Sequence, residues 1–148
     1  MTSLVARMNL DLFAQPLLQA IGFAGILSAD GAAGILRARY VTRSELTHSG
    51  GRVLQGGIVT AWMDSAMAMV VYAHDASCLV SSLELKVSFL EPVGNGAFEV
   101  EARILRQGRN IAFLEADVWS DERKLHARAS STGKLIRRHE AGGAASRP

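Results

Sequence analysis

Cysteine, proline and aromatic residues are all scarce in this chain of 148 residues. Its one cysteine, Cys78, excludes an intrachain disulfide, and a chain without disulfides is typical of a reducing cytoplasm. Neither sign of charge dominates, because 16 basic residues face 14 acidic ones, so no nucleic-acid partner is expected. Nothing at the N-terminus combines basic residues with an apolar core and a cleavage site, so we expect a cytoplasmic protein.

Long apolar runs are also missing. The longest extends over residues 58–73 and is interrupted by Asp64, whereas a membrane-spanning helix needs about 20 apolar residues. We therefore expect no membrane association. Hydrophobic residues make up 49% of the chain and charged residues 20%, a balance that favours one globular domain over residues 1–138. The small and polar residues 139–148 predict a disordered tail.

The N-terminal part of the chain favours a helix followed by two strands. Residues 1–22 carry apolar side chains at helical spacing, and Pro16 marks a helix start or a kink. Two strands are expected to follow, joined around Asp30-Gly31, because this glycine readily takes the positive φ of a tight hairpin turn.

The middle and the C-terminal part predict one long helix and then four strands. The stretch VLQGGIVTAWMDSAMAMVV, residues 53–71, is apolar on all sides of a helix that starts near Gly56, which indicates a helix enclosed by other structure. From residue 79 onward the period is two, with an expected apolar face of Leu83, Leu85, Val87 and Phe89. The order predicts an α+β domain in which an antiparallel sheet curls around the helix.

Asp64 is the residue that most needs an explanation, because a lone carboxylate in an apolar helix costs several kcal/mol unless it is paired or protonated. Two readings stay open on helix position alone: contact with water or an arginine at an edge of the fold, or a chemical role. Gly56 and Gly57 at the helix start offer free N–H groups and the positive end of the helix dipole, which suit a developing oxyanion. The combination favours chemistry, with Asp64 two turns further along the same helix.

Other reaction classes lack their motifs. The sequence has no GxSxG, GxxxxGK[ST], GxGxxG, HExxH or CxxC pattern. Its four histidines are scattered, so no metal site and no cofactor are expected. Cys78 is interpreted as a packing residue.

VLQGGIVTAWMDSAMAMVV, together with SSLELKVSFLEPV and QGRNIAFLEADVW, resembles the hot-dog fold acyl-CoA thioesterases of the phenylacetate-degradation (PaaI-like) type. The resemblance covers about residues 45–136. It implies a hot-dog fold, in which a curved antiparallel sheet wraps a long central helix, and a homodimer that completes the active sites, with a dimer of dimers as a further possibility. It implies hydrolysis of acyl-CoA to the free acid and CoA.

The resemblance also implies roles for individual residues. Asp64 corresponds to the catalytic carboxylate, either general base or nucleophile, and Gly56 to the glycine whose N–H polarises the thioester carbonyl. Ser82 corresponds to a strand serine that helps place the water or the carboxylate, often across the dimer interface. The expected substrate-binding residues are Gly57, Ser49, Met63, Met67, Arg106 and Arg109, the methionines as a wall of the acyl pocket and the arginines for the CoA phosphates.

Two positions depart from the family pattern. Gln55, which we expect to orient the reacting groups together with Ser82 in the catalytic site, stands where a histidine is common. It hydrogen-bonds but does not titrate near neutral pH. Ser49 stands where Asn or Gln is frequent. These departures leave open an alternative, a non-catalytic acyl-CoA binding or sensing protein on the same fold. A hot-dog dehydratase or hydratase is disfavoured, because no histidine occurs within five residues after Asp64.

Overall fold

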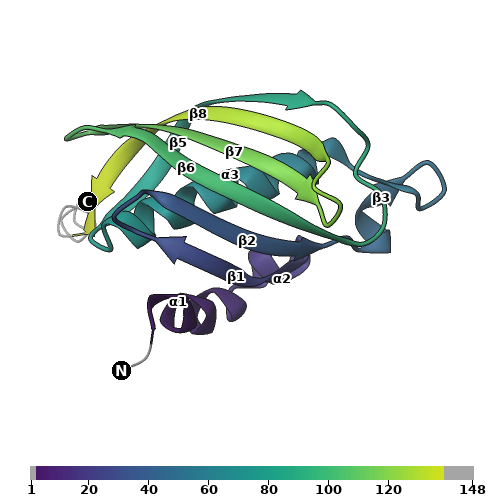
Figure 1. The fold of residues 1–148 in the computed structure, drawn as a ribbon, viewed down its shortest axis with the longest axis horizontal. Coiled ribbons are helices and arrows are strands. Elements are labelled where there is room, and N and C mark those ends of the chain that lie inside the picture. Colours follow the sequence, from purple (N-terminus) through teal and green to yellow (C-terminus); the bar gives the residue numbers. More distant parts are fainter. Residues whose placement is uncertain (1–2, 139–148) are drawn as a thin grey trace, which may run out of the picture.

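The computed structural model describes residues 3–138, which form an α+β domain with a single large sheet around one long helix (Figure 1). The six antiparallel strands of that sheet follow the order β1-β2-β6-β7-β8-β5, and β3 pairs with β4 in a separate small ribbon. The helices and strands are α1 (Leu4–Phe13), α2 (Pro16–Ala20), β1 (Phe23–Asp30), β2 (Ile35–Val41), β3 (Thr47–His48), β4 (Val53–Leu54), α3 (Gly56–His74), β5 (Cys78–Phe89), β6 (Ala97–Gln107), β7 (Ile111–Ser120) and β8 (Leu125–Arg137).

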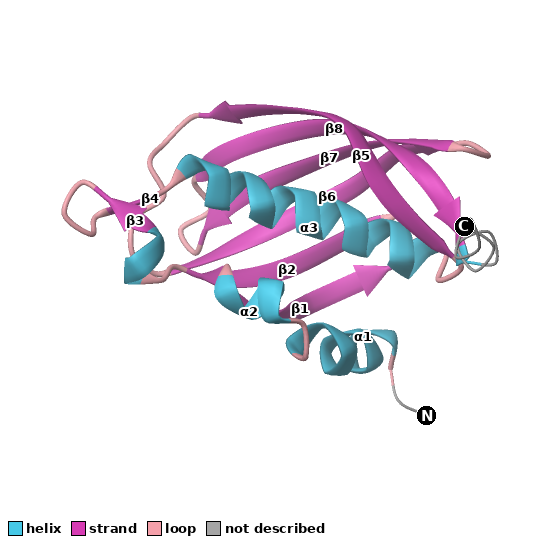
Figure 2. Ribbon diagram, turned by 180° about the vertical axis from the view of Figure 1, so that it is seen from behind, coloured by secondary structure: helices cyan, strands magenta, loops and turns pink. Residues whose placement is uncertain are grey.

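Helix α3 lies along the concave face of the curved sheet, as Figure 2 shows. By length and composition alone it could cross a membrane, but eight of its side chains are buried in this domain. They pack against the inner side chains of the central strands, for example Leu36 of β2 and Val100 of β6, both fully buried. The predicted hot-dog architecture is confirmed. The tail expected at 139–148 lies outside the described residues.

The N-terminal segment forms two helices rather than one, and Pro16 begins the second, where its missing N–H costs nothing. Helix α1 is attached to the edge strand β1 by the side chain of Asn9. Its Oδ1 accepts from the Ile26 N–H at 2.7 Å, and its Nδ2 donates to the Ile26 carbonyl at 3.3 Å. One edge of the sheet is therefore partly covered by α1, which leaves β5 as the open edge.

The turn between β1 and β2 differs from the sequence prediction. Gly34, not Gly31, takes the positive φ, at 66°. Gly31 is needed for a different reason: a Cβ placed there would meet the Ala73 carbonyl oxygen at 2.4 Å. The turn is longer than the tight hairpin expected around Asp30-Gly31, and it lies against the C-terminal end of α3.

Candidate active site

The start of α3 leaves one backbone donor unpaired. Gln55 precedes the helix as its N-cap, and its Oε1 accepts from the N–H groups of Gly57 at 2.5 Å and Ile58 at 3.3 Å. Glycine at position 57 makes this possible, because a Cβ there would lie 2.7 Å from that oxygen. Within residues 3–138 the Gly56 N–H has no hydrogen-bond acceptor. It points outward from the positive end of the helix dipole, which suits an oxyanion.

Asp64 and Ser82 meet in the middle of the helix. The Ser82 hydroxyl of β5 donates to Oδ1 of Asp64 at 2.6 Å, a distance typical of a hydrogen bond to a carboxylate. Asp64 is half-buried, and among the described residues no lysine, arginine or histidine lies within 4.0 Å of its carboxylate. The pair thus forms within one chain, and the carboxylate keeps its second oxygen for another partner.

A β-bulge directs Ser82 toward α3. The register of β5 against β8 shifts between Ser82 and Glu84, so that Leu83 is the extra residue and is 60% exposed. An extra residue reverses the alternation beyond it. Ser82 therefore shares its face with Leu85, which packs against the core, and Leu83 is not on the apolar face that the sequence pattern predicted.

Gly56 and Asp64 of one chain are too far apart to act on the same carbonyl group. Eight residues at the helical rise of 1.5 Å place their backbones about 12 Å apart along α3. A thioester oxygen at hydrogen-bond distance from the Gly56 N–H is out of reach of the carboxylate of the same helix. Gly56 and Asp64 of a single helix, the combination that the sequence suggested, therefore do not form a complete reaction centre.

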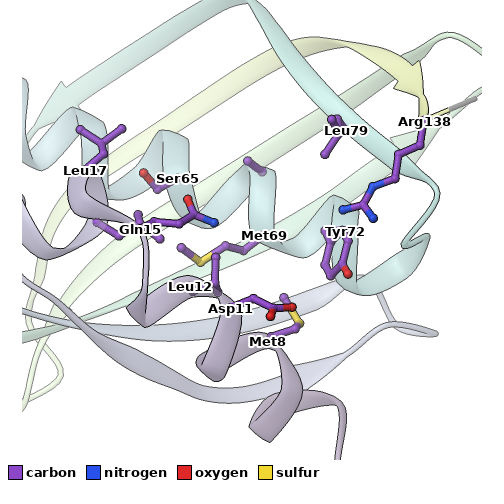
Figure 3. A pocket seen from close by; sticks show the side chains of 12 residues that line it. Met8, Asp11, Leu12, Gln15, Leu17, Ser65, Met69, Tyr72, Leu79 and Arg138 are labelled. Carbon is purple, nitrogen blue, oxygen red and sulfur yellow. The ribbon is translucent and has the colours of Figure 1, made fainter. Parts of the chain in front are cut away.

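Two cavities open along α3, one near each of these groups. The first, of about 310 Å³, adjoins the helix start and is lined by His48, Val53, Leu54, Gly56, Val59, Phe89, Leu90, Glu91, Pro92 and Val93. The Phe89 ring lies over Gly56, since a Cβ on Gly56 would meet it at 3.2 Å. The second, of about 320 Å³, adjoins the half of α3 beyond Asp64 and is shown in Figure 3.

The other predicted site residues are Ser49, the methionines Met63 and Met67, and the arginines Arg106 and Arg109. Ser49 is exposed, and its hydroxyl lies 2.8 Å from Nδ1 of His48. His48 lines the cavity at Gly56, although it was not among the predicted site residues. Met63 and Met67 are fully buried and line neither of these two cavities, so their assignment to the acyl wall stays a prediction. Met69 and Tyr72 line the second cavity instead.

Arg106 and Arg109 are exposed at the turn between β6 and β7. That turn lies at the end of the sheet where α3 terminates, away from Gly56, because Ile104 contacts Gly34 of the β1–β2 turn (Figure 1). Their contact with CoA stays a prediction. In residues 3–138 no cluster of three or more histidine, cysteine or acidic side chains could hold a metal ion. Cys78 is buried, which raises the pKa of its thiol and agrees with its interpretation as a packing residue.

Comparison with known proteins assigns the family. The family model of the thioesterase superfamily matches residues 51–127. A curated relative from Saccharolobus solfataricus, named "Putative esterase", is 30% identical over 104 residues, which is 70% of this chain and 69% of the relative. The chain belongs to the thioesterase superfamily.

Solved structures sharpen the assignment. A phenylacetic acid degradation-related protein from Ralstonia eutropha JMP134 is 32% identical, with a TM-score of 0.73 over 89% of this chain and 99% of that chain. The same fold recurs in a thioesterase from Haemophilus influenzae (22% identity, TM-score 0.79, 93% of each chain). It also recurs in the E. coli PaaI protein from the phenylacetic acid degradation operon (19%, 0.76, 90% and 96%). The PaaI-like hot-dog thioesterase expected from the sequence is confirmed.

Proposed function

We propose that this protein hydrolyses acyl-CoA thioesters to the free acid and CoA. One observation carries the proposal most: in a thioesterase-superfamily fold, and among residues 3–138, the Asp64 carboxylate is hydrogen-bonded by Ser82 without a cationic partner, and the Gly56 N–H has no acceptor. A carboxylate and an unpaired donor are the two groups that thioester hydrolysis needs. The reaction needs no metal and no redox cofactor.

The reactive centre is proposed to form between two copies of the chain. The two groups lie about 12 Å apart on one helix. Two α3 helices packed antiparallel about a two-fold axis bring Gly56 of one copy beside Asp64 of the other. The open edge of β5 supports such a homodimer, because its backbone is unpaired in the single chain and Leu79 and Leu83 are 45% and 60% exposed. A dimer of dimers stays a further possibility.

The chemistry follows from these positions. The Gly56 N–H of one copy binds the carbonyl oxygen and stabilises the negative charge that develops on it. Asp64 of the other copy either takes a proton from water, which then attacks the carbonyl carbon, or attacks directly to form an anhydride that water cleaves. The C–S bond breaks, CoA leaves as the thiol with a proton from the water, and the hydroxyl of the water remains in the acid. Ser82 holds Asp64 in position.

Gln55 acts in the proposed site through the helix start. Because its carbonyl oxygen occupies the N–H groups of Gly57 and Ile58, the substrate oxygen has only the Gly56 N–H to bind. The side chain is uncharged at every pH near neutrality, so it adds no ionisation to the pH profile. A histidine at this position would add one.

The test is thiol release from acyl-CoA substrates by a matched pair of variants at Gly56. Gly56→Pro removes the N–H at the first helical position, where proline fits, and Gln55 already has the extended backbone that proline requires of the preceding residue. Gly56→Ala keeps the N–H and adds the same Cβ, so it controls for contact with Phe89. We expect turnover to fall about 10²- to 10³-fold in Gly56→Pro relative to Gly56→Ala.

Equal turnover of the two variants would exclude Gly56 as the oxyanion donor. If the wild-type protein binds acyl-CoA without any thiol release, the proposed enzyme function is wrong, and the alternative of a non-catalytic acyl-CoA binding protein is supported.

A further inference from the structure

We propose that the cavity between the two N-terminal helices and α3 is the acyl pocket, and that it selects unbranched aliphatic acyl groups of medium length. The inference rests on the proposed function, since it names the substrate class of the same site. The cavity of about 320 Å³ is at the lower end of the volumes typical of small-molecule sites, about 300 to 1,000 Å³. Its lining consists of Met8, Asp11, Leu12, Gln15, Leu17, Leu18, Ser65, Ala68, Met69, Tyr72, Leu79 and Arg138.

The lining is mainly apolar. Figure 3 shows α1 with Met8 and Leu12 on one side and α3 with Met69 and Tyr72 on the other. Thioether and leucine side chains supply an adaptable apolar surface, which suits an alkyl chain better than a polar group. The sequence predicted Met63 and Met67 as this wall, whereas Met69, two residues beyond Met67 on α3, lines the cavity.

The cavity begins about one turn beyond the carboxylate of the proposed reaction centre. Asp64 does not line it, but Ala68, four residues further on nearly the same side of α3, does, and so do Ser65 and Tyr72. An acyl chain whose carbonyl carbon lies at Asp64 therefore reaches the cavity after its first methylene groups. It can extend along α3 as far as Tyr72, eight residues after Asp64, which is about 12 Å at the helical rise of 1.5 Å per residue.

Charged groups limit the length at the far end. The Arg138 guanidinium lies 5.3 Å from the centre of the Tyr72 ring, and the Asp11 carboxylate is exposed on α1. Both residues line the cavity and are exposed, and Figure 3 shows Arg138 beside Tyr72. An alkyl chain that extends past Tyr72 gains no further apolar contact. It also desolvates the charged groups of Arg138 and Asp11, which is unfavourable.

The outer wall of the cavity comes from two parts of the chain. The lining residues from α1, from α2 and at position 138 lie outside residues 51–127, the part that the superfamily model matches, whereas Ser65, Ala68, Met69, Tyr72 and Leu79 lie inside it. We infer that the N-terminal helices and α3 together determine which acyl-CoA this protein hydrolyses.

The first measurement is kcat/KM for thiol release over a series from butanoyl-CoA to hexadecanoyl-CoA. Burial of each added methylene should raise kcat/KM about fourfold until the chain reaches Tyr72, and kcat/KM should then level off or fall. A series without length dependence, in an enzyme that does release thiol, would overturn the pocket and leave the proposed function intact.

The second measurement uses Ala68→Leu with Ala20→Leu as its matched control. Leucine is a good helix former and fills the cavity from α3, so we expect the ratio of kcat/KM for decanoyl-CoA to that for butanoyl-CoA to fall at least about tenfold. Ala20 is an exposed residue of α2 that does not line the cavity, and its variant should keep the wild-type ratio. An unchanged ratio in Ala68→Leu would contradict the pocket.

A binding measurement separates the pocket from the chemistry. Calorimetric titration with the thioethers S-butyl-CoA and S-decyl-CoA, which cannot be hydrolysed, should show tighter binding of the decyl compound by wild-type protein and loss of this preference in Ala68→Leu. That result without thiol release from any thioester would disprove the proposed function but support the pocket. Equal affinity for the two thioethers would refute the pocket itself.

Discussion

Two aspartates in this domain have opposite surroundings. Asp117, on the outer face of the sheet, is 1% exposed, yet two arginines neutralise it: Arg128 donates to both of its oxygens at 2.6 and 2.9 Å, and Arg103 donates to Oδ2 at 3.0 Å. Asp64, under the inner face, is more exposed and has only the hydroxyl of Ser82. The more deeply buried carboxylate is therefore the one whose charge is compensated.

Under the proposed function, this difference separates a structural charge, Asp117, from a reactive one, Asp64. Burial alone would raise the pKa of Asp117, but the hydrogen bonds from Arg128 and Arg103 outweigh it, and the pKa lies below its ordinary value. Both carboxylate oxygens of Asp117 accept hydrogen bonds from the two arginines, so neither oxygen is left for a substrate. Asp64 keeps an oxygen without a partner, at an open edge of the fold and beside a cavity, which is where a general base or a nucleophile has to be.

The largest expected effect is the loss of turnover in Asp64→Asn. Asparagine keeps the shape and can still accept from Ser82, but it neither takes a proton nor attacks, so kcat should fall about 10²- to 10⁴-fold. The thermal midpoint should not fall, because no ion pair is lost. Turnover close to that of wild type in a folded Asp64→Asn variant would remove Asp64 from the mechanism.

Asp117→Asn should show the reverse pattern. The substitution removes the charge that accepts hydrogen bonds from Arg128 and Arg103, while Arg103 keeps its ion pairs with Glu101 and Glu115. Because a hydrogen bond to a charged group contributes about 1.5 to 3 kcal/mol, we expect the free energy of unfolding to fall by about that amount. Urea denaturation measures this loss, and kcat of the folded variant should stay at the wild-type value. A stability equal to that of wild type would show that the buried charge pair adds nothing.

The pH dependence of stability provides a control for Asp117. Its folded pKa is below the unfolded value of 3.8, so ionised Asp117 stabilises the fold above that pH, and the contribution is lost as the pH falls through the folded pKa. The difference in stability between wild type and Asp117→Asn should therefore shrink below about pH 4. A difference that persists undiminished in acid would assign the effect to packing.

The smallest of these effects is expected for Ser82→Ala. The variant removes one hydrogen bond to Asp64, worth about 1.5 to 3 kcal/mol for a charged acceptor, so kcat should fall about 10- to 150-fold, and KM should change little. Ser82→Thr keeps the hydroxyl and should restore most of the activity. Failure of threonine to restore more than alanine would mean that the hydroxyl does not position the carboxylate.

The helix and its two reactive groups could be predicted from the sequence because they violate local preferences. A carboxylate in an apolar helix and two glycines at its start are visible without a structure. The same uniform apolarity limits the prediction at Met63 and Met67, because a helix that is apolar on every side does not indicate which of its methionines face a cavity.

Ser82 shows why the strands were harder to interpret. Strict alternation would direct it away from α3, and only the family resemblance placed it beside Asp64. The bulge at Leu83 that reorients it is defined by pairing with β8, which is distant in the sequence. The positive φ predicted at Gly31 was wrong for a similar reason. A glycine is needed there because of a contact with the end of α3, which is distant in the sequence.

The most direct test of the central claim is complementation between two inactive variants. If Gly56 of one copy and Asp64 of the other form each reactive centre, mixed dimers of Gly56→Pro and Asp64→Asn contain one centre with both groups intact. Random exchange of subunits should then restore about a quarter of wild-type turnover, since about half of the dimers are mixed and each has one working centre of two. No recovery of thiol release, with mixed dimers demonstrated by mass spectrometry, would contradict the shared centre.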